Sequence, residues 1–203
     1  MSIVLGFDAT STGLAHIPPG QHQLAGYTTQ LNPGDGIAWT TAQWDAHPGA
    51  LRICQNAAAT DRTADVLDIE RGAATIAEAP GWYRDAVGHY HAGTRPGQRW
   101  PAFYASQDNI TPLVNHLIAS GITSGPGLII ANWSISEGQA AHEVLGAGGP
   151  FPVKGMQFQS FQFYDVDVWS ESWLAVVSKV PPHLVGAELV AKFSDGSVRT
   201  YAA

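Results

Sequence analysis

Apolar and polar residues along the chain form short runs that predict eight β-strands, with a few helices between them. An apolar run of about four to eight residues, bounded by glycine, proline or small polar residues, is typical of a buried strand. Runs of this kind lie at residues 3–7, 24–28, 50–55, 65–69, 101–106, 127–133, 155–163 and 164–169. Helical spacing and helix start and stop signals predict helices at residues 40–47, 73–87, 109–120 and 136–145, the second of them interrupted or restarted at Pro80-Gly81.

The order of these elements predicts the fold class. Strands that alternate with short helices indicate an α/β fold with a parallel sheet. Acidic or aromatic residues end several of the strands, which favours a closed barrel over an open sheet. We therefore predict a small (β/α)8 TIM-like barrel over residues 1–178. The chain has 203 residues, fewer than the ~250 typical of this fold, so several helices must be short or missing.

The remaining residues, 179–203, are predicted to form a separate C-terminal β-hairpin. Strand-like runs at 188–193 and 198–201 flank an Asp195-Gly196 pair, which is a strong hairpin signal. Two prolines, Pro181 and Pro182, separate this tail from the barrel. Two interpretations stay open: the hairpin binds an assembly partner, or it covers the edge or floor of the barrel.

The strand at residues 65–69 carries the most informative chemistry. Residues i and i+2 of a strand point to the same face, so Asp68 and Glu70 share one face while Leu67 and Ile69 share the other. The two acidic residues lie roughly 6.6 Å apart along the backbone, close enough for both carboxyl groups to reach one substrate bond. An apolar strand that ends in two acids is typical of an α/β-barrel active site. The alternative is a pair of ordinary surface acids.

Other candidate residues lie at the ends of other predicted strands. Glycoside hydrolysis needs one carboxylic acid to protonate the leaving oxygen and a second carboxylate to attack, to stabilise the cationic centre or to activate water. Aromatic side chains can hold the apolar face of a sugar ring. The predicted catalytic acids are Asp8, Asp68, Glu70 and Asp165. The predicted substrate-binding residues are Tyr104, Trp133, Gln157, Gln159 and Asp167.

The order of these segments resembles that of the glycoside hydrolase family 25 lysozymes and of related glycoside-hydrolase-like barrels from actinobacteria and their phages. The resemblance covers roughly residues 3 to 170. The matching segments are Gly6-Phe7-Asp8, Leu67-Asp68-Ile69-Glu70, Ala102-Phe103-Tyr104, Ile130-Ala131-Asn132-Trp133, Met156-Gln157-Phe158 and the run from Tyr164 to Trp169. It implies that Glu70 is the proton donor, that Asp68 assists it, and that Asp8 and Asp165 line the pocket.

The resemblance implies a muramidase-type enzyme whose substrate is peptidoglycan or a related cell-wall glycan. The sequence departs from the family at two places that bear on substrate binding. Ile53-Cys54-Gln55 stands where the family has an aromatic pair, and Met156 stands where it has a tryptophan. An alternative therefore stays open, in which a non-catalytic or weakly active barrel is a structural or sugar-binding protein of a phage virion or tail.

Charge and composition argue against several other functions. The net charge is −7 and no basic run is present, which disfavours nucleic acid as a partner. No apolar run approaches the ~18 residues of a membrane span, and no basic, apolar signal peptide opens the sequence. We expect cytoplasmic synthesis, followed by action at the cell wall or within a phage particle.

The sequence predicts neither a cofactor nor a metal. A single cysteine, Cys54, excludes an internal disulfide and an all-cysteine zinc site. His89 and His91 have the spacing of some metal ligands, but surface histidines are the favoured interpretation. Asp68 and Glu70 could alternatively bind magnesium for phosphoester chemistry. That alternative is disfavoured, because no phosphate-binding glycine-rich loop accompanies them.

Overall fold

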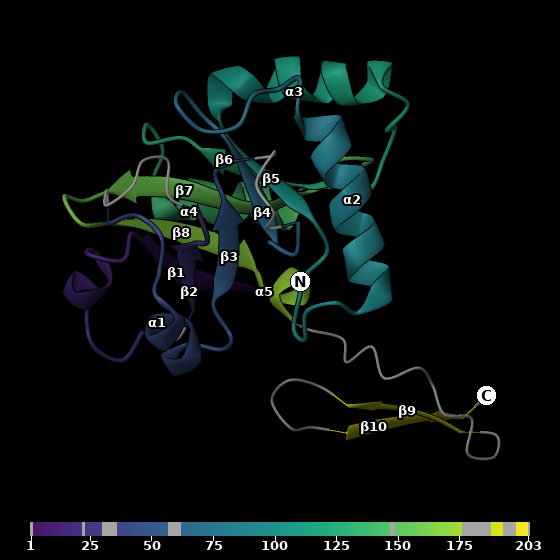
Figure 1. Ribbon diagram of the computed structural model, residues 1–203, viewed down its shortest axis with the longest axis horizontal. Coiled ribbons are helices and arrows are strands. Elements are labelled where there is room, and N and C mark those ends of the chain that lie inside the picture. The colour runs from purple at the N-terminus through teal and green to yellow at the C-terminus, as the bar shows by residue number, and fades with distance from the viewer. Residues whose placement is uncertain are drawn as a thin grey trace.

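The computed structural model describes residues 2–21, 23–29, 36–56, 62–146 and 149–175, and the backbone of two further strands near the C-terminus. Eight strands between Ile3 and Ser170 close into a barrel in chain order (Figure 1). The strands are β1 Ile3–Ala9, β2 Leu24–Tyr27, β3 Leu51–Cys54, β4 Val66–Ile69, β5 Ala102–Ser106, β6 Gly127–Ala131, β7 Val153–Ser160 and β8 Tyr164–Ser170. The prediction of a closed eight-stranded α/β barrel is confirmed.

The barrel is mixed rather than wholly parallel. Strands β1 to β7 run parallel to one another, whereas β8 runs antiparallel to both of its neighbours, β7 and β1. Only residues 161–163 join β7 to β8, too few for the crossover that a parallel pair needs. The predicted parallel sheet is therefore wrong for the last strand. This geometry places the start of β8, not its end, at the barrel mouth, the rim where β1 to β7 finish.

Helices cover part of the outer wall. The α-helices of the described ranges are α1 Thr41–Ala46, α2 Ala79–Ala92, α3 Gln107–Ala119, α4 Glu137–Gly146 and α5 Glu171–Leu174. Helices α2 and α3 lie side by side over β4, β5 and β6 (Figure 1), where Trp82 and Leu113 pack against Leu67 and Phe103. Helix α4 packs on β7 and β8.

Two helices differ from their predictions. Helix α2 begins at Ala79, near the predicted restart at Pro80-Gly81 and not at residue 73. The Glu78 carboxylate accepts hydrogen bonds from the N–H and hydroxyl of Thr75 and holds a turn just before the helix. Pro80 then falls in the first turn, where no intrahelical N–H is required. Helix α5 was not predicted, since four residues are too few for a helical period to be visible.

The barrel interior is packed. Trp169 on β8 is 2% exposed and lies across the barrel between β1 and β7. A Cβ atom on Gly6 would lie 2.3 Å from its ring, and one on Gly155 2.5 Å, so both positions need glycine. The small cavity above it, lined by residues that include Asp8, Asp167 and Tyr104, has a volume of about 10 Å³. That is room for about one water molecule.

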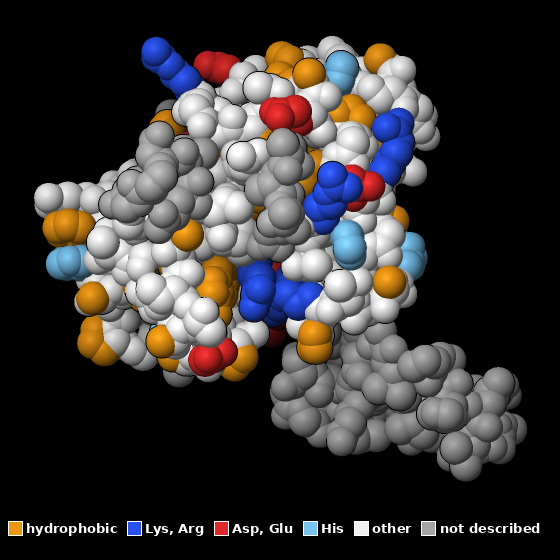
Figure 2. All heavy atoms as spheres, in the orientation of Figure 1, with side chains coloured by type: hydrophobic (Ala, Val, Ile, Leu, Met, Phe, Trp, Pro, Cys, Tyr) orange, Lys and Arg blue, Asp and Glu red, His pale blue; other side chains and the backbone are white. Residues whose placement is uncertain are grey.

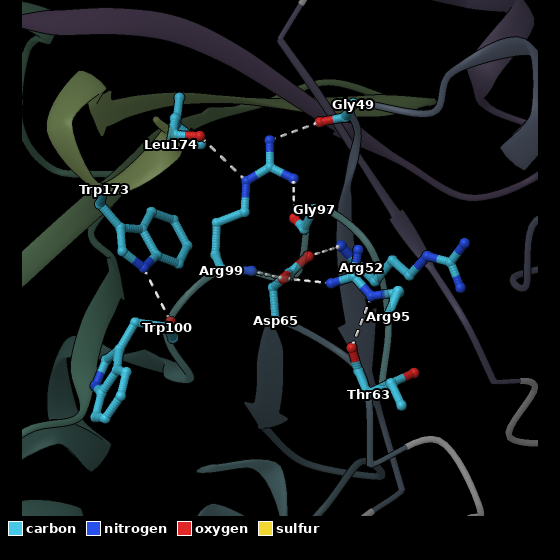
Figure 3. Close-up of polar contacts among 10 residues, drawn as sticks. All are labelled: Gly49, Arg52, Thr63, Asp65, Arg95, Gly97, Arg99, Trp100, Trp173 and Leu174. Carbon is cyan, nitrogen blue, oxygen red and sulfur yellow. Dashed lines mark hydrogen bonds and ion pairs between the residues drawn. The ribbon is translucent and has the colours of Figure 1, made fainter. Parts of the chain in front are cut away.

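A polar cluster closes the barrel floor, the end opposite the mouth (Figure 3). Asp65, just before β4, is buried and forms an ion pair with Arg95. Its carboxylate also accepts hydrogen bonds from the backbone N–H groups of Arg52 (2.9 Å) and Arg99 (2.5 Å). The Arg99 guanidinium donates to the carbonyl oxygens of Gly49, Gly97 and Leu174, and so joins three segments far apart in sequence.

Near the C-terminus, β9 Glu188–Lys192 pairs antiparallel with β10 Val198–Ala202, as the predicted hairpin requires. The pair forms a sheet of its own and lies outside the barrel in Figure 1. The predicted Asp195-Gly196 turn and the proline pair lie outside the described residues. None of the helices that the structure describes is both long and apolar enough to cross a membrane.

Candidate active site

Five carboxyl side chains gather inside the barrel at and just below its mouth. Their positions follow from strand alternation and register: Asp8 on β1 stands opposite Asp165 on β8, and Asp68 on β4 stands beside Tyr104 on β5. Glu70 comes directly after β4. The fifth acid is Asp167 on β8, whose register partners are Gly6 and Gln157. The structure thus brings together the four predicted catalytic acids and Asp167. We call these five residues the mouth acids.

Gln157 connects one of the mouth acids to two aromatic side chains. Its amide oxygen accepts hydrogen bonds from the Tyr104 hydroxyl (2.7 Å) and from Trp133 Nε1 (3.0 Å). Its amide nitrogen donates to Asp8 Oδ2 at 3.1 Å. An indole can only donate, so Trp133 fixes which way the amide faces. Gln157 is 1% exposed and both ends of its amide are used within the protein. It therefore holds Tyr104, Trp133 and Asp8 in fixed relative positions.

Asp68 is a buried acid whose pKa is raised to near neutrality. Its side chain is 3% exposed; Oδ2 accepts a hydrogen bond from Gln55 Nε2 at 3.3 Å, and Oδ1 has no partner. Burial, together with the nearby charge of Glu70, raises the pKa of Asp68 to about 7, although the Gln55 hydrogen bond opposes this.

Glu70 lies closer to solvent and is only half-buried. Burial and the charge of Asp165 raise the pKa of Glu70, while a hydrogen bond with the Tyr104 hydroxyl lowers it. The two acids of this strand thus differ in their surroundings: Asp68 is buried with a pKa near 7, and Glu70 is the more accessible.

The other three mouth acids act on one another through their charges, and Asp8 also hydrogen-bonds Asp165. Burial raises the pKa values of Asp8 and Asp167 well above the usual range, and the charge of Asp165 raises both further. Burial also raises the pKa of Asp165. Asp165 Oδ1 and Asp167 Oδ2 are buried without a hydrogen-bond partner. Within the described ranges, no lysine or arginine forms an ion pair with a mouth acid.

The remaining predicted substrate-binding residues divide into two groups. Trp133 follows β6 and is 57% exposed at the mouth, and Tyr104 lies inside the barrel at 7% exposure. Gln159 is exposed and does not join the site. A β-bulge in β7 shifts the register between residues 157 and 159 relative to β8, and Gln157 takes the inner position.

Sequence reasoning missed two residues of the site. Tyr27, at the end of β2, has a pKa raised by burial and then by the charges of four mouth acids, Asp8 first. Gln55 follows β3 and hydrogen-bonds Asp68. Both residues lie at the C-terminal end of a predicted strand, and the C-terminal ends of these strands form the mouth. That shared position was the available signal.

The described residues include no group of three or more histidine, cysteine, aspartate or glutamate side chains placed to hold a metal ion. His89 and His91 lie in the last turn of α2, and the Nδ1 atom of His89 contacts the Thr94 hydroxyl at 3.2 Å.

Comparisons of the chain with models of protein families, with curated proteins and with solved structures found no match.

Proposed function

We propose that the protein is a glycoside hydrolase of muramidase type, with a TIM-like barrel, that cleaves peptidoglycan or a related cell-wall glycan. The observation that carries the proposal is the pair formed by Asp68, whose pKa is raised to about 7, and the more accessible Glu70. A carboxylic acid that stays protonated near neutral pH beside a second carboxyl group is what acid-catalysed glycosidic cleavage requires.

Glu70 is the residue placed to contact the glycosidic oxygen, because it is the more exposed member of the pair. The Tyr104 hydroxyl has one proton and two neighbours, Gln157 and Glu70. A hydrogen bond from this hydroxyl favours the carboxylate form of Glu70 and lowers its pKa, whereas burial and the charge of Asp165 raise it. The charge of Glu70 raises the pKa of Asp68, so the two acids titrate as a pair.

In the proposed reaction the proton moves from the Asp68–Glu70 pair to the leaving oxygen as the C–O bond breaks. Positive charge then develops on the sugar carbon. Asp165 is half-buried at the mouth and its charge acts on Glu70, so it is the carboxylate placed to stabilise that charge. Water adds to the sugar carbon and returns a proton to the pair.

Asp8 and Asp167 have a different role in this proposal from the one predicted. They are 4% and 1% exposed, and Asp8 is covered by Gln157. Neither can contact a sugar. Asp8 accepts a hydrogen bond from Gln157, and the charges of both acids raise the pKa values of Tyr27 and Tyr104.

The proposal is tested by measuring reducing ends released from purified cell wall. Glu70→Gln keeps the size of the side chain and removes the transferable proton, so turnover should fall about 10²–10⁴-fold. Glu137→Gln, at an exposed glutamate in the first turn of α4, is the matched control and should leave turnover unchanged. Equal activity of Glu70→Gln and the wild type would refute the catalytic assignment.

A second candidate is a sugar-binding or structural barrel of a phage particle, acting at the cell wall without hydrolysis. The burial of Asp8 and Asp167 and the separate β9–β10 sheet, which is suited to an assembly partner, favour it. Mass spectrometry of purified particles would then find the chain in fixed stoichiometry, and the protein would bind cell wall while releasing no reducing ends.

A further inference from the structure

We infer that the turn between β7 and β8 is a second glycan-binding surface, with Phe161 and Phe163 as its stacking platforms. We call residues 161–164 the aromatic turn. The inference rests on the proposed function for its ligand class and extends it: the ligand is an oligosaccharide or polymer longer than the two sugars that flank the cleaved bond.

The aromatic turn is placed directly beside the mouth acids. Strand β7 ends at Ser160, which pairs in register with Asp165 on β8. The turn therefore begins one residue after the partner of a proposed catalytic carboxylate. In Figure 1 it projects at the left end of the barrel, and Figure 2 shows hydrophobic side chains and a histidine gathered at that end.

Its aromatic rings are unusually exposed for phenylalanine. Phe161 is 46% exposed and Phe163 is 42% exposed, and Trp133, after the neighbouring strand β6, is 57% exposed. These three are half of the six large hydrophobic residues that are exposed in the described part of the chain. A group of apolar residues at one rim marks a contact surface. A flat ring without a polar tip suits the apolar C–H face of a sugar.

The rings are also held in place before any ligand arrives. The Phe161 N–H donates to the Tyr164 carbonyl at 2.9 Å, and the two rings pack 5.0 Å apart. Phe163 stacks on His16, with ring centroids 3.8 Å apart and an angle of 11° between the planes. His16 lies in the short 3-10 helix Leu14–His16 after β1. His16 thus covers one face of the Phe163 ring, and the remaining surface of that ring is open to solvent.

A glycine fixes the turn against the loop that follows β1. A Cβ atom on Gly13 would lie 2.0 Å from the Phe163 carbonyl oxygen, so only glycine allows this approach. Such bracing reduces the entropy lost when a ligand orders the rings, which is how a rigid platform gains affinity. The geometry is that of a preformed site rather than of loosely exposed side chains.

Binding is measured in the Glu70→Gln background, so that ligand is not consumed. The ligands are chitohexaose and chitobiose, and the affinity of each is measured by calorimetric titration. Phe161→Ala combined with Phe163→Ala should weaken hexasaccharide binding about tenfold and leave disaccharide binding within twofold. Ile118→Ala, at a residue of α3 that is 47% exposed, is the control and should change neither.

A second variant tests placement without removing a ring. Gly13→Ala keeps both phenylalanines but displaces the turn, so hexasaccharide binding should weaken while circular dichroism shows an intact fold. Equal hexasaccharide affinity with and without the two rings overturns the inference. So does an equal loss for both sugars, or phenylalanine-dependent binding to phosphatidylcholine vesicles without glycan binding.

Failure of this inference can be told apart from failure of the hydrolase proposal. Wild-type turnover that depends on Glu70, with hexasaccharide affinity independent of the two rings, overturns only the inference. Ring-dependent binding without Glu70-dependent turnover supports the inference and leaves the sugar-binding candidate in place of the hydrolase.

Discussion

The two ends of the barrel bury the same kind of side chain in opposite electrostatic surroundings. At the floor, Asp65 is buried beside Arg95 and accepts two backbone hydrogen bonds. At the mouth, acids face acids, and oxygens of Asp68 and Asp167 have no hydrogen-bond partner. The difference teaches that a buried carboxylate stabilises a fold only where its charge is compensated. Uncompensated acids persist where they serve chemistry.

The largest expected effect is at the floor. Asp65→Ala leaves Arg95 unpaired and removes the acceptor of two backbone N–H groups, so the free energy of unfolding should fall by about 3–5 kcal/mol. Urea unfolding followed by fluorescence measures the change. Asp45→Ala, at an exposed position in α1, is the control and should stay within about 0.5 kcal/mol. A loss below about 1 kcal/mol for Asp65→Ala would remove the contrast between the two ends.

The mouth should make stability depend on pH. Asp68 has a pKa of about 7 in the folded protein and about 3.9 when unfolded, so between these values the folded state binds a proton that the unfolded state has released. The stabilisation is complete below about pH 4 and is lost as the pH rises through 7. Unfolding free energies from pH 4 to pH 8 should therefore decline, and Asp68→Asn should flatten the decline. An equal slope in the variant would show that Asp68 does not carry it.

A smaller, opposite effect is expected deeper in the mouth. Asp167→Asn keeps the shape of a buried side chain and removes a carboxyl group whose ionisation is opposed by burial and by the charge of Asp165, so it should stabilise the protein by about 1 kcal/mol at pH 7.5. For a chain of this size the melting temperature would rise by about 2–4 °C. Asp45→Asn serves as the matched surface control. Destabilisation by Asp167→Asn would mean that its charge is compensated after all.

The sequence predicted the mouth better than the floor. Strand alternation correctly placed Asp68 inside the barrel and Leu67 with Ile69 outside it, because a two-residue period is a local property. At the floor, Asp65 contacts Arg95 and Arg99, which are 30 and 34 residues away in sequence. A pattern of neighbouring residues does not predict contacts over such a separation.

Two other features depended on details that a pattern of apolar residues does not contain. The antiparallel direction of β8 follows from the three-residue connection after β7, a signal that was present in the sequence but was outweighed by the expectation of a parallel sheet. The choice of Gln157 over Gln159 follows from a β-bulge, which changes which residues face inward without changing the sequence pattern.

The central claim is that the mouth holds a proton near neutral pH on the pair of Asp68 and Glu70. Titration of the side-chain carboxyl carbons by NMR tests it directly, with Asp68→Asn used to identify the Asp68 signal. We predict that this carboxyl group titrates with a midpoint of about 7. A midpoint below about 5, close to an ordinary aspartate, would contradict the account.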